Sequence, residues 1–339
     1  MRVAIVAEFL GNIEEPSAFN SRFLTIADKL REEKIEVDIL TSDYIHGLKR
    51  HATGTIEYKD CGFYALHEPG YAKNISIRRF YSHHILARNL KSFFKSYSAP
   101  DLLYCAVPSL DFAYVAGCYA KEHGIPFVVD IQDLWPEAFS LFSSCDFFFA
   151  PLQRQADFIY ATADQVIGVS DTYCQRAMRV NKKCDKAHTV YLGNSLLDFD
   201  QNVIHGHERC NRDSTKIYIG YCGSIERSYD IRTAIDAVSD ICRRGYTNVV
   251  LRIMGSGSLL ESLKEYAEEI SCPVEFWGHV PYPEMCAMLS ECDIAVNPIV
   301  KGAAQSIINK HGDYACAGIP VVNSQECEEY RQLIDTYEM

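Results

Sequence analysis

The sequence predicts an α/β protein made of two doubly wound domains, and three observations lead to that prediction. Short apolar runs rich in β-branched residues are nearly continuous rather than alternating, which is typical of strands in a parallel sheet covered on both faces. Helix-like segments separate these runs, so strand and helix alternate along both halves of the chain. One polar stretch without periodicity, residues 199–215, divides the elements into two sets. We therefore expect two Rossmann-like domains, residues 1–198 and 216–339, facing each other across a cleft, with 199–215 as the linker.

The individual elements follow from apolar runs and helix stops. Gly124-Ile125-Pro126 ends one helix and leads into the next strand, because Gly closes helices and Pro cannot continue them. In the first domain, strands are expected at 2–7, 35–40, 102–107, 126–131, 165–169 and 188–192, and helices at 17–33, 78–97, 110–123 and 152–162. In the second, strands are expected at 216–222, 248–254, 273–277 and 293–297, and helices at 229–244, 258–270 and 282–292.

Composition excludes several classes of protein. A net charge of −12 over 339 residues argues against general nucleic-acid binding, which requires a broad basic face. The 14 cysteines include no Cys-x-x-Cys pair and many lie in apolar runs, which favours free thiols in a reducing cytosol over disulfides or a zinc site. No apolar run approaches the roughly 20 residues that span a bilayer, and the chain begins with a strand rather than a signal peptide. We therefore expect a cytoplasmic protein.

The segment from Gln305 to Val322, QSIINKHGDYACAGIPVV, is the most informative in the chain. It predicts a loop, a helix that ends at Ala-Gly, and a short buried strand. The free N–H groups and positive dipole end of such a helix bind phosphate, and Asp313 on its first turns can accept hydrogen bonds from ribose hydroxyls. The segment resembles the signature of retaining GT-B glycosyltransferases of the family-four type, in which two Glu residues are separated by seven others. Gln305 and Asp313 stand at those two positions.

The resemblance covers nearly all of the chain and implies a GT-B fold whose C-terminal domain binds a nucleotide sugar, with UDP as the expected nucleotide. Lys310 is either a positive charge for the departing diphosphate or an exposed residue at a helix start. Asp313 is either a ribose acceptor or a carboxylate that suits the helix dipole, and Arg227 is either a diphosphate contact or a solvated side chain. The other donor-binding residues implied are Gln305 for a sugar hydroxyl, Gly223 and Gly255 in two turns, His279 and Val280 for the base, and the backbone N–H groups of Ser306, Ile307 and Ile308.

In the first domain, Asp133 follows a buried strand in the sequence DIQDLWP, and the resemblance implies that it orders the donor sugar or the acceptor. The alternative is an Asp that only stabilises the turn before Trp-Pro. Gly11 would allow the first loop to approach the acceptor closely. Residues 73–95 hold six Lys and Arg and no acidic residue. This segment is either an amphipathic surface helix or a basic face, including Arg88 and Lys91, that binds a lipid-linked acceptor at the inner face of the cell membrane.

Two further motifs bear on cofactors. Asp198-Phe199-Asp200 matches the metal-binding mark of a different glycosyltransferase fold, but it lies at the mouth of the predicted linker, so we expect no essential metal and no cofactor. The turn Met254-Gly255-Ser256-Gly257 mimics a dinucleotide fingerprint, yet Leu260 occupies the place of the third glycine.

The function implied by the resemblance is transfer of a sugar, with retention, from a nucleotide donor to a hydroxyl of a glycan or lipid-linked acceptor, in polysaccharide or cell-envelope assembly. The absence of both signature Glu residues leaves a second hypothesis, a non-catalytic subunit that binds nucleotide sugars. A third is a sugar-nucleotide epimerase of the same fold. Family members usually continue through another strand and helices, so the resemblance implies that the C-terminal domain is truncated at Met339.

Overall fold

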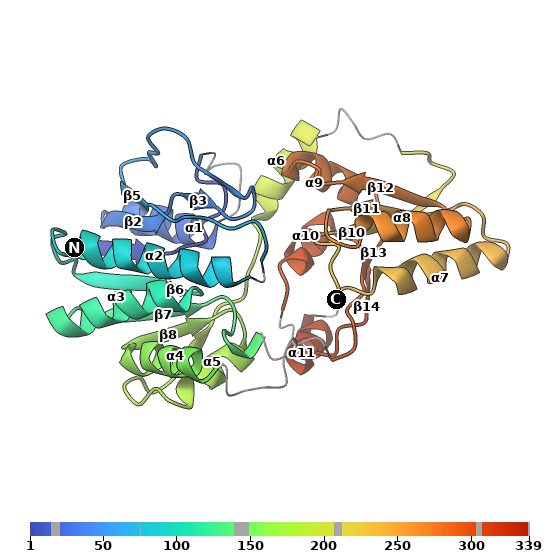
Figure 1. Cartoon of the computed structure of the whole chain (residues 1–339). Helices are drawn as coiled ribbons and strands as arrows, with labels where there is room; N and C mark the ends of the chain where they lie inside the picture. The colour runs from blue at the N-terminus through green and yellow to red at the C-terminus, as the bar shows by residue number, and fades with distance from the viewer. Residues whose placement is uncertain (15–20, 75, 139–148, 207–211, 303–306, 338–339) are drawn as a thin grey trace. The chain divides into compact units, whose positions relative to one another are not determined.

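The computed structural model describes residues 1–14, 21–74, 76–138, 149–206, 212–302 and 307–337. The chain divides into two compact units, Met1–Tyr191 and Leu192–Met339. Each unit contains one parallel sheet with helices on both faces (Figure 1). The predicted fold class, α/β with doubly wound sheets, is therefore confirmed. Among the described residues, no helix combines the length and the apolar character needed to span a bilayer.

The sheet of the first unit has seven parallel strands in the order β5-β2-β1-β6-β7-β8-β9. Its strand order reverses between β1 and β6, which are neighbours in the sheet but far apart in sequence. A separate antiparallel hairpin, β3 with β4, follows β2. The bounds are β1 Arg2–Val6, β2 Glu36–Ser42, β3 Tyr44–Ile45, β4 Arg50–His51, β5 Gly62–Leu66, β6 Leu102–Val107, β7 Phe127–Ile131, β8 Gln165–Gly168 and β9 His188–Thr189.

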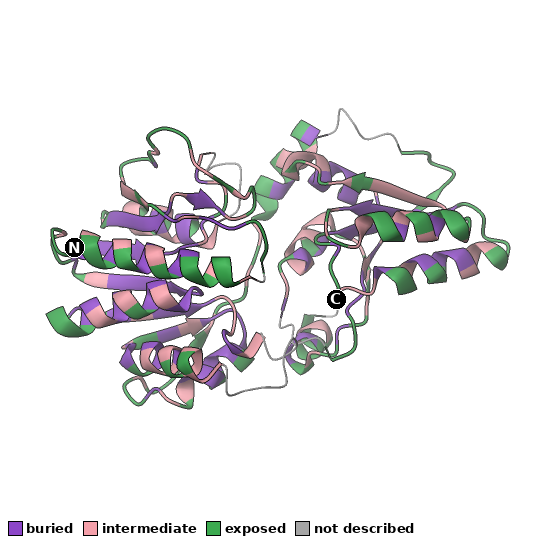
Figure 2. Ribbon diagram, viewed as in Figure 1, coloured by how far each residue is buried: buried purple, intermediate pink, exposed green. Residues whose placement is uncertain are grey.

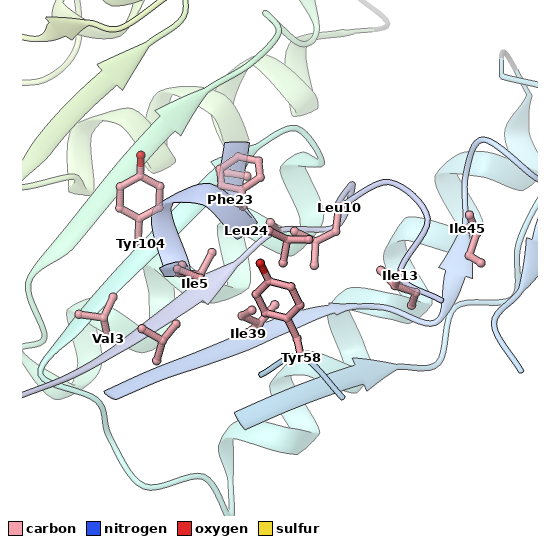
Figure 3. Packing of buried hydrophobic residues seen from close by; sticks show 14 residues of the cluster. Val3, Ile5, Leu10, Ile13, Phe23, Leu24, Ile39, Ile45, Tyr58 and Tyr104 are labelled. Carbon is pink, nitrogen blue, oxygen red and sulfur yellow. The ribbon is translucent and has the colours of Figure 1, made fainter. Parts of the chain in front are cut away.

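Helices cover both faces of this first sheet. Helix α1 packs Phe23 and Leu24 on the face that carries Ile5 and Ile39, and these side chains form the centre of one core (Figure 3). The connection from β5 to β6 crosses the sheet in the direction opposite to that of the connection from β1 to β2. Its right-handed crossover therefore places α2 on the other face of the sheet from α1, beside α3. The bounds are α1 Arg22–Glu32, α2 Ile77–Phe94, α3 Leu110–His123, α4 Ala150–Thr162 and α5 Asp171–Met178.

The sheet of the second unit has five parallel strands in the order β12-β11-β10-β13-β14, and its order reverses between β10 and β13. Helices α7 and α8 bury Ile235 and Leu263 against Leu251, and α9 and α10 bury Met288 and Tyr314 in a separate cluster. Figure 2 shows the resulting stripes, buried toward the sheet and exposed on the outer side of α7 and α8. The bounds are β10 Ile217–Cys222, α7 Ile231–Arg243, β11 Val249–Met254, α8 Leu260–Glu269, β12 Val274–Gly278, α9 Tyr282–Ser290, β13 Ile294–Asn297, α10 Lys310–Ala317, β14 Val321–Asn323 and α11 Glu328–Tyr337.

The region predicted as a structureless linker contains a helix, α6 (Leu196–Gly206), and the division between the units falls between Tyr191 and Leu192. Phe199 and Val203, four residues apart, pack into the cluster of α9 and α10. A Cβ atom on Gly206 would lie 2.0 Å from the carbonyl oxygen of Pro283, so α6 approaches the start of α9 closely. Three other apolar side chains of α6 are exposed, so its apolar residues do not mark one face and their periodicity is too weak to predict the helix; they are Leu196, Leu197 and Ile204.

Other differences are smaller. The strand expected at 188–192 is reduced to β9, and the sequence did not predict β5, the β3–β4 hairpin or α5. The helix expected from residue 17 begins at Arg22, while residues 15–20 lie outside the described part of the chain. The helix stop at Gly124 is confirmed, with this residue in the left-handed conformation at φ 65°.

Candidate functional site

The first candidate site lies at the carboxyl edge of the second sheet, where the strand order reverses between β10 and β13. Ligands of doubly wound sheets bind at such reversal points. The turns after neighbouring strands are joined here: Gly223 N–H donates to Met254 O (2.9 Å) and Gly255 N–H donates to Gly278 O (2.7 Å). A Cβ atom on Gly255 would lie 1.8 Å from Gly223 O. The two turns therefore pack backbone against backbone, and position 255 requires glycine.

Lys310 begins α10 beside these turns and is 7% exposed. Its Nζ donates to Tyr221 Oη (3.1 Å) and lies 4.3 and 3.7 Å from the ring centres of Tyr221 and Tyr229. A Cβ atom on Gly223 would lie 3.2 Å from Nζ, so the ammonium group borders the glycine turn. Burial lowers the pKa of Lys310 to about 8, and no carboxylate among the described residues forms an ion pair that would oppose this shift. The interpretation of Lys310 as an exposed helix-start residue is therefore wrong.

Asp313 lies on the first turn of α10, as predicted. Its Oδ1 accepts hydrogen bonds from Asn194 Nδ2 (2.6 Å) and Tyr282 Oη (2.9 Å). Burial raises the pKa of Asp313 to about 6, and these two hydrogen bonds oppose the shift. Tyr314 anchors the helix, since its Oη donates to Val296 O (3.0 Å) and accepts from the backbone N–H of Cys222 (3.3 Å). The helix that carries Lys310 and Asp313 is thus fixed to both strands at the reversal point.

The second candidate site is a cavity of about 280 Å³ at the reversal point of the first sheet, between the ends of β1 and β6. Asp133 lines it, as the prediction of a site at DIQDLWP requires. The Asp133 carboxylate accepts hydrogen bonds from Leu134 N–H (2.9 Å) and from Trp135 Nε1 (3.2 Å), so it also stabilises its own turn. Burial raises the pKa of this carboxyl. The walls include Phe9, His46, Arg79, Pro108, Asp133 and Trp135.

Comparison with known proteins decides the family. The profile described as Glycosyltransferase Family 4 matches residues 20–195, and the profile described as Glycosyl transferases group 1 matches residues 216–337. The chain belongs to glycosyltransferase family 4. A search of curated protein sequences gave no match.

Solved structures show that this glycosyltransferase has the GT-B fold, as predicted. HepE from Anabaena, solved in complex with UDP, superimposes with a TM-score of 0.64 at 14% identity, over 98% of this chain and 83% of that chain. Sucrose-phosphate synthase from Thermosynechococcus elongatus gives 0.66 at 14% identity, over 95% and 81%. WaaG, a glycosyltransferase involved in lipopolysaccharide biosynthesis, gives 0.62 at 14% identity, over 99% and 84%.

The structure of the glycosyltransferase brings together only some of the donor residues implied by the sequence. Gly223, Gly255, Lys310 and Asp313 come from the turns and the helix at the β10–β13 reversal point. Ile307 is buried and Ile308 is half-buried, directly before α10. Arg227 and His279 are exposed, whereas Val280 packs against the cluster of α9 and α10. Gln305 and Ser306 lie outside the described residues.

The acceptor residues implied by the sequence do not form one group. Gly11 is exposed after β1 and has a φ of 92°, which favours glycine. Arg88 and Lys91 are exposed on α2, and neither forms an ion pair with a described residue nor lines the cavity. The basic segment instead contributes Arg79 to the cavity wall.

Sequence reasoning missed most of the side chains that surround the two sites. Tyr221 and Tyr229 flank Lys310, and Asn194 and Tyr282 hold Asp313, although their positions are far apart in sequence. A signal existed for Tyr221, which stands at the end of a predicted strand and therefore at the sheet edge. No local pattern marks Asn194, because only the packing of α6 and its preceding residues brings it to α10.

The expectation that no metal is required stays a prediction. Asp198 and Asp200 are exposed on α6, two residues apart, and side chains at that spacing do not share a helix face. Two other groups in the first unit have ligand atoms within 4.8 Å of one another. They are Asp43 with His51 and His67, and Glu8 with Glu68 and His83.

Proposed function

We propose that this glycosyltransferase moves a sugar from a UDP-linked donor to a hydroxyl of a glycan or lipid-linked acceptor, with retention at the anomeric carbon. The observation that carries the proposal is Lys310, a cation held between Tyr221 and Tyr229 at the reversal point and without a carboxylate partner among the described residues. A diphosphate would supply the missing counter-charge, and the N-terminus of α10 adds its own positive field. UDP is supported by HepE, which was solved with UDP and with UDP-glucose.

The proposed chemistry places positive charge where negative charge develops. As the bond between the anomeric carbon and the diphosphate oxygen breaks, charge accumulates on the diphosphate, and a fixed ammonium group beside it lowers the barrier. Retention follows if the acceptor hydroxyl attacks the anomeric carbon on the face from which the diphosphate departs. A phosphate oxygen then takes the hydroxyl proton, so that no protein nucleophile is required. We expect this reaction to proceed without an essential metal.

Asp313 is proposed as the acceptor of ribose hydroxyl hydrogen bonds. Its position on the first turn of α10, within three residues of Lys310, supports this role. The Oδ1 atom already accepts two hydrogen bonds, from Asn194 and Tyr282, which fix the direction of the carboxylate. The Oδ2 atom has no hydrogen-bond donor among the described residues and is the atom we assign to the ribose.

Polysaccharide or cell-envelope assembly at the inner face of the cell membrane is the proposed setting. Arg88, Lys91 and Lys95 support it, because all three are exposed and form no ion pair with a described residue. Cations in such a position would attract anionic lipids. WaaG, one of the solved structures with this fold, is a glycosyltransferase of lipopolysaccharide biosynthesis.

Calorimetric titration with UDP, GDP and ADP tests the donor site. UDP should bind best, and both Lys310→Met and Asp313→Asn should weaken its binding. Lys264→Met on α8 is the matched control, since this lysine pairs with Glu261 on the surface and should not affect the donor. If none of the nucleotides binds, or if Lys310→Met leaves UDP affinity unchanged, the proposed donor site is wrong.

Incubation with UDP-glucose alone separates the three hypotheses from the sequence. Slow release of UDP and free glucose indicates a transferase that uses water in place of the acceptor. Appearance of an isomeric nucleotide sugar indicates an epimerase. Binding without any conversion, even when acceptors are supplied, indicates a non-catalytic subunit.

A further inference from the structure

Arg79 lines the cavity of the first unit as a charged side chain without an ion-pair partner among the described residues. It is held in place on several sides. The guanidinium carbon lies 4.6 Å from the ring centre of Trp135, 5.4 Å from that of Tyr71 and 5.7 Å from that of Phe9. Such cation–π contacts orient a guanidinium group but do not neutralise its charge.

Two of the three nitrogens of Arg79 have acceptors within the protein. Nε donates to His83 Nε2 (3.4 Å) and Nη1 donates to Asn74 O (2.9 Å). Nη2 has no acceptor among the described residues. Since a guanidinium presents its donors in one plane and prefers paired oxygens, an unfilled Nη2 at a cavity wall is a ready position for an oxyanion.

His46 adds a second donor to the same cavity. Its Nδ1 lies 2.6 Å from Tyr71 Oη and 3.3 Å from Lys49 Nζ. Because an ammonium group can only donate, Nδ1 is the acceptor and the ring proton is on Nε2. Burial and the nearby cations lower the pKa of His46 to about 4, so this neutral form persists at pH 7. No described residue accepts a hydrogen bond from Nε2.

Three carboxyl groups lie near Arg79, namely Glu8 and Glu68 behind the cavity and Asp133 in its wall, and none of them forms an ion pair with Arg79 among the described residues. The Asp133 carboxylate is held by Leu134 N–H and Trp135 Nε1. Glu8 Oε1 lies 3.1 Å from His83 Nε2, and that nitrogen already accepts from Arg79. Glu8 Oε1 forms no hydrogen bond with a described residue, and complete burial raises the pKa of Glu8 well above the usual range, which favours the neutral carboxyl. Glu68 accepts hydrogen bonds from Ser42 (2.6 Å) and Ser82 (2.7 Å) and has its pKa raised by burial.

We propose that this cavity binds an oxyanion of the acceptor, a phosphate ester or a carboxylate, with Arg79 Nη2 and His46 Nε2 as donors. Trp135 and Phe9 provide the apolar wall on which a sugar ring packs. A volume of about 280 Å³ is at the small end of ligand pockets and suits one charged sugar unit rather than a long glycan. The assignment of an anion site follows from this cavity alone. Only the identification of the bound anion as part of the acceptor rests on the proposed function. Arg79 is thus a specificity-determining residue that selects an acidic or phosphorylated acceptor.

Fluorescence of Trp135 tests the proposal directly. The chain has two tryptophans, so Trp277→Phe leaves Trp135 as the only one. In that background, D-glucose 1-phosphate, D-glucuronate and neutral D-glucose are titrated separately. At least one of the two charged sugars should change the emission of Trp135 in a saturable way. The charged sugar with the higher affinity shows whether the cavity prefers a phosphate ester or a carboxylate. Neutral glucose should bind at least about tenfold more weakly, as expected for loss of a charge-assisted hydrogen bond.

Variants of neighbouring arginines separate a specific site from general charge. Arg79→Gln should weaken binding of the charged sugar about tenfold or more. Arg79→Lys, which keeps the charge, should fall between wild type and Arg79→Gln, and it guards against a folding defect. Arg78→Gln is the matched control, because Arg78 is exposed and donates to Gly70 O (3.2 Å) away from the cavity walls. Its affinity should equal that of wild type.

Three results would overturn the proposal. One is binding of the charged sugars that is unchanged in both Arg79 variants. Another is neutral glucose binding as tightly as the charged sugars. The third is a change in Trp135 emission that UDP alone causes and that Arg79→Gln abolishes, because this result would assign the cavity to the donor diphosphate. Failure of UDP to bind anywhere, with anion binding intact, would instead contradict the proposed donor site and leave the cavity assignment standing.

Discussion

Replacing Lys310 with Met should stabilise the second unit while removing donor binding. The pKa of this lysine falls from 10.5 to about 8 on burial, which at pH 7 corresponds to about 3 kcal/mol of unfolding free energy lost to the buried charge. Met has a similar length and no charge. The variant also loses the hydrogen bond to Tyr221 Oη and the contacts with the two rings, which together contribute about 1–2 kcal/mol. We therefore expect a net gain of about 1–2 kcal/mol at pH 7.

The pH dependence gives the sharper test. Between about pH 8 and 10.5 the folded chain binds fewer protons at Lys310 than the unfolded chain, so this group makes wild-type stability rise with pH across that window. The stability of Lys310→Met lacks this contribution. The excess of its unfolding free energy over that of wild type should therefore shrink from pH 7 to about pH 9.5. Urea unfolding is followed through Trp277 in a Trp135→Phe background, so that the signal comes from the second unit. Lys264→Met is the control and should change stability by less than about 0.5 kcal/mol.

Donor binding is measured on the same proteins. In wild type, a bound diphosphate would raise the pKa of Lys310 above about 8, so UDP affinity should fall as pH rises through that value. In Lys310→Met, UDP affinity should be low and independent of pH in this range. A variant that is less stable than wild type at pH 7 would refute the reasoning, because the ring contacts would then outweigh the loss of hydration. A variant that is stabilised but still binds UDP normally would refute the assignment of Lys310 to the diphosphate.

Three further variants test the geometry of the second unit. Gly255→Ala places a methyl group 1.8 Å from Gly223 O and should cost about 3 kcal/mol and much of the UDP affinity, whereas Gly47→Ala, which meets nothing within 4 Å, should be neutral in urea unfolding and calorimetry. Asp313→Asn keeps an oxygen for Asn194 and Tyr282 but no longer ionises at about pH 6. Since the terminal phosphate of UDP also titrates at about pH 6, UDP affinity should fall from pH 7 to pH 5 in both proteins but more steeply in wild type, and equal profiles would exclude the carboxylate from the ribose site. Since the pKa of Asp313 lies above the unfolded value of 3.8, ionisation of Asp313 costs stability as pH rises through about 6, and Asp313→Asn should be the more stable protein in urea at pH 7. Tyr314→Phe leaves the Cys222 N–H and Val296 O without this partner and should cost about 1–3 kcal/mol in urea unfolding, and a neutral result would show that α10 is not anchored through the hydroxyl.

Sequence alone was sufficient where structure depends on local chain properties. Continuous apolar runs predicted the parallel strands β1, β6, β10 and β11 within about one residue, because a strand buried on both faces needs apolar side chains throughout. Gly124 predicted the end of α3, since few other residues adopt its left-handed conformation. The segment before Val322 predicted α10 and placed Lys310 and Asp313 on it. Helix α6 could not be predicted in this way, because only two of its five apolar side chains pack into the core and the other three are exposed, so they mark no single face.

Only the tertiary structure decided what surrounds the candidate residues. By its type and its place at a helix start, Lys310 would be expected to be exposed. It is buried because β10 and α10 meet at a strand reversal that no local pattern encodes. The cavity likewise joins Phe9, Arg79 and Trp135, which lie far apart in sequence but follow or cover neighbouring strand ends. The pKa values of Lys310 and Asp313 arise from burial, which is a property of packing. The sequence by itself therefore determined the family, the elements and the helix that bears the donor residues, while the charge and the partners of each site came from contacts between distant segments.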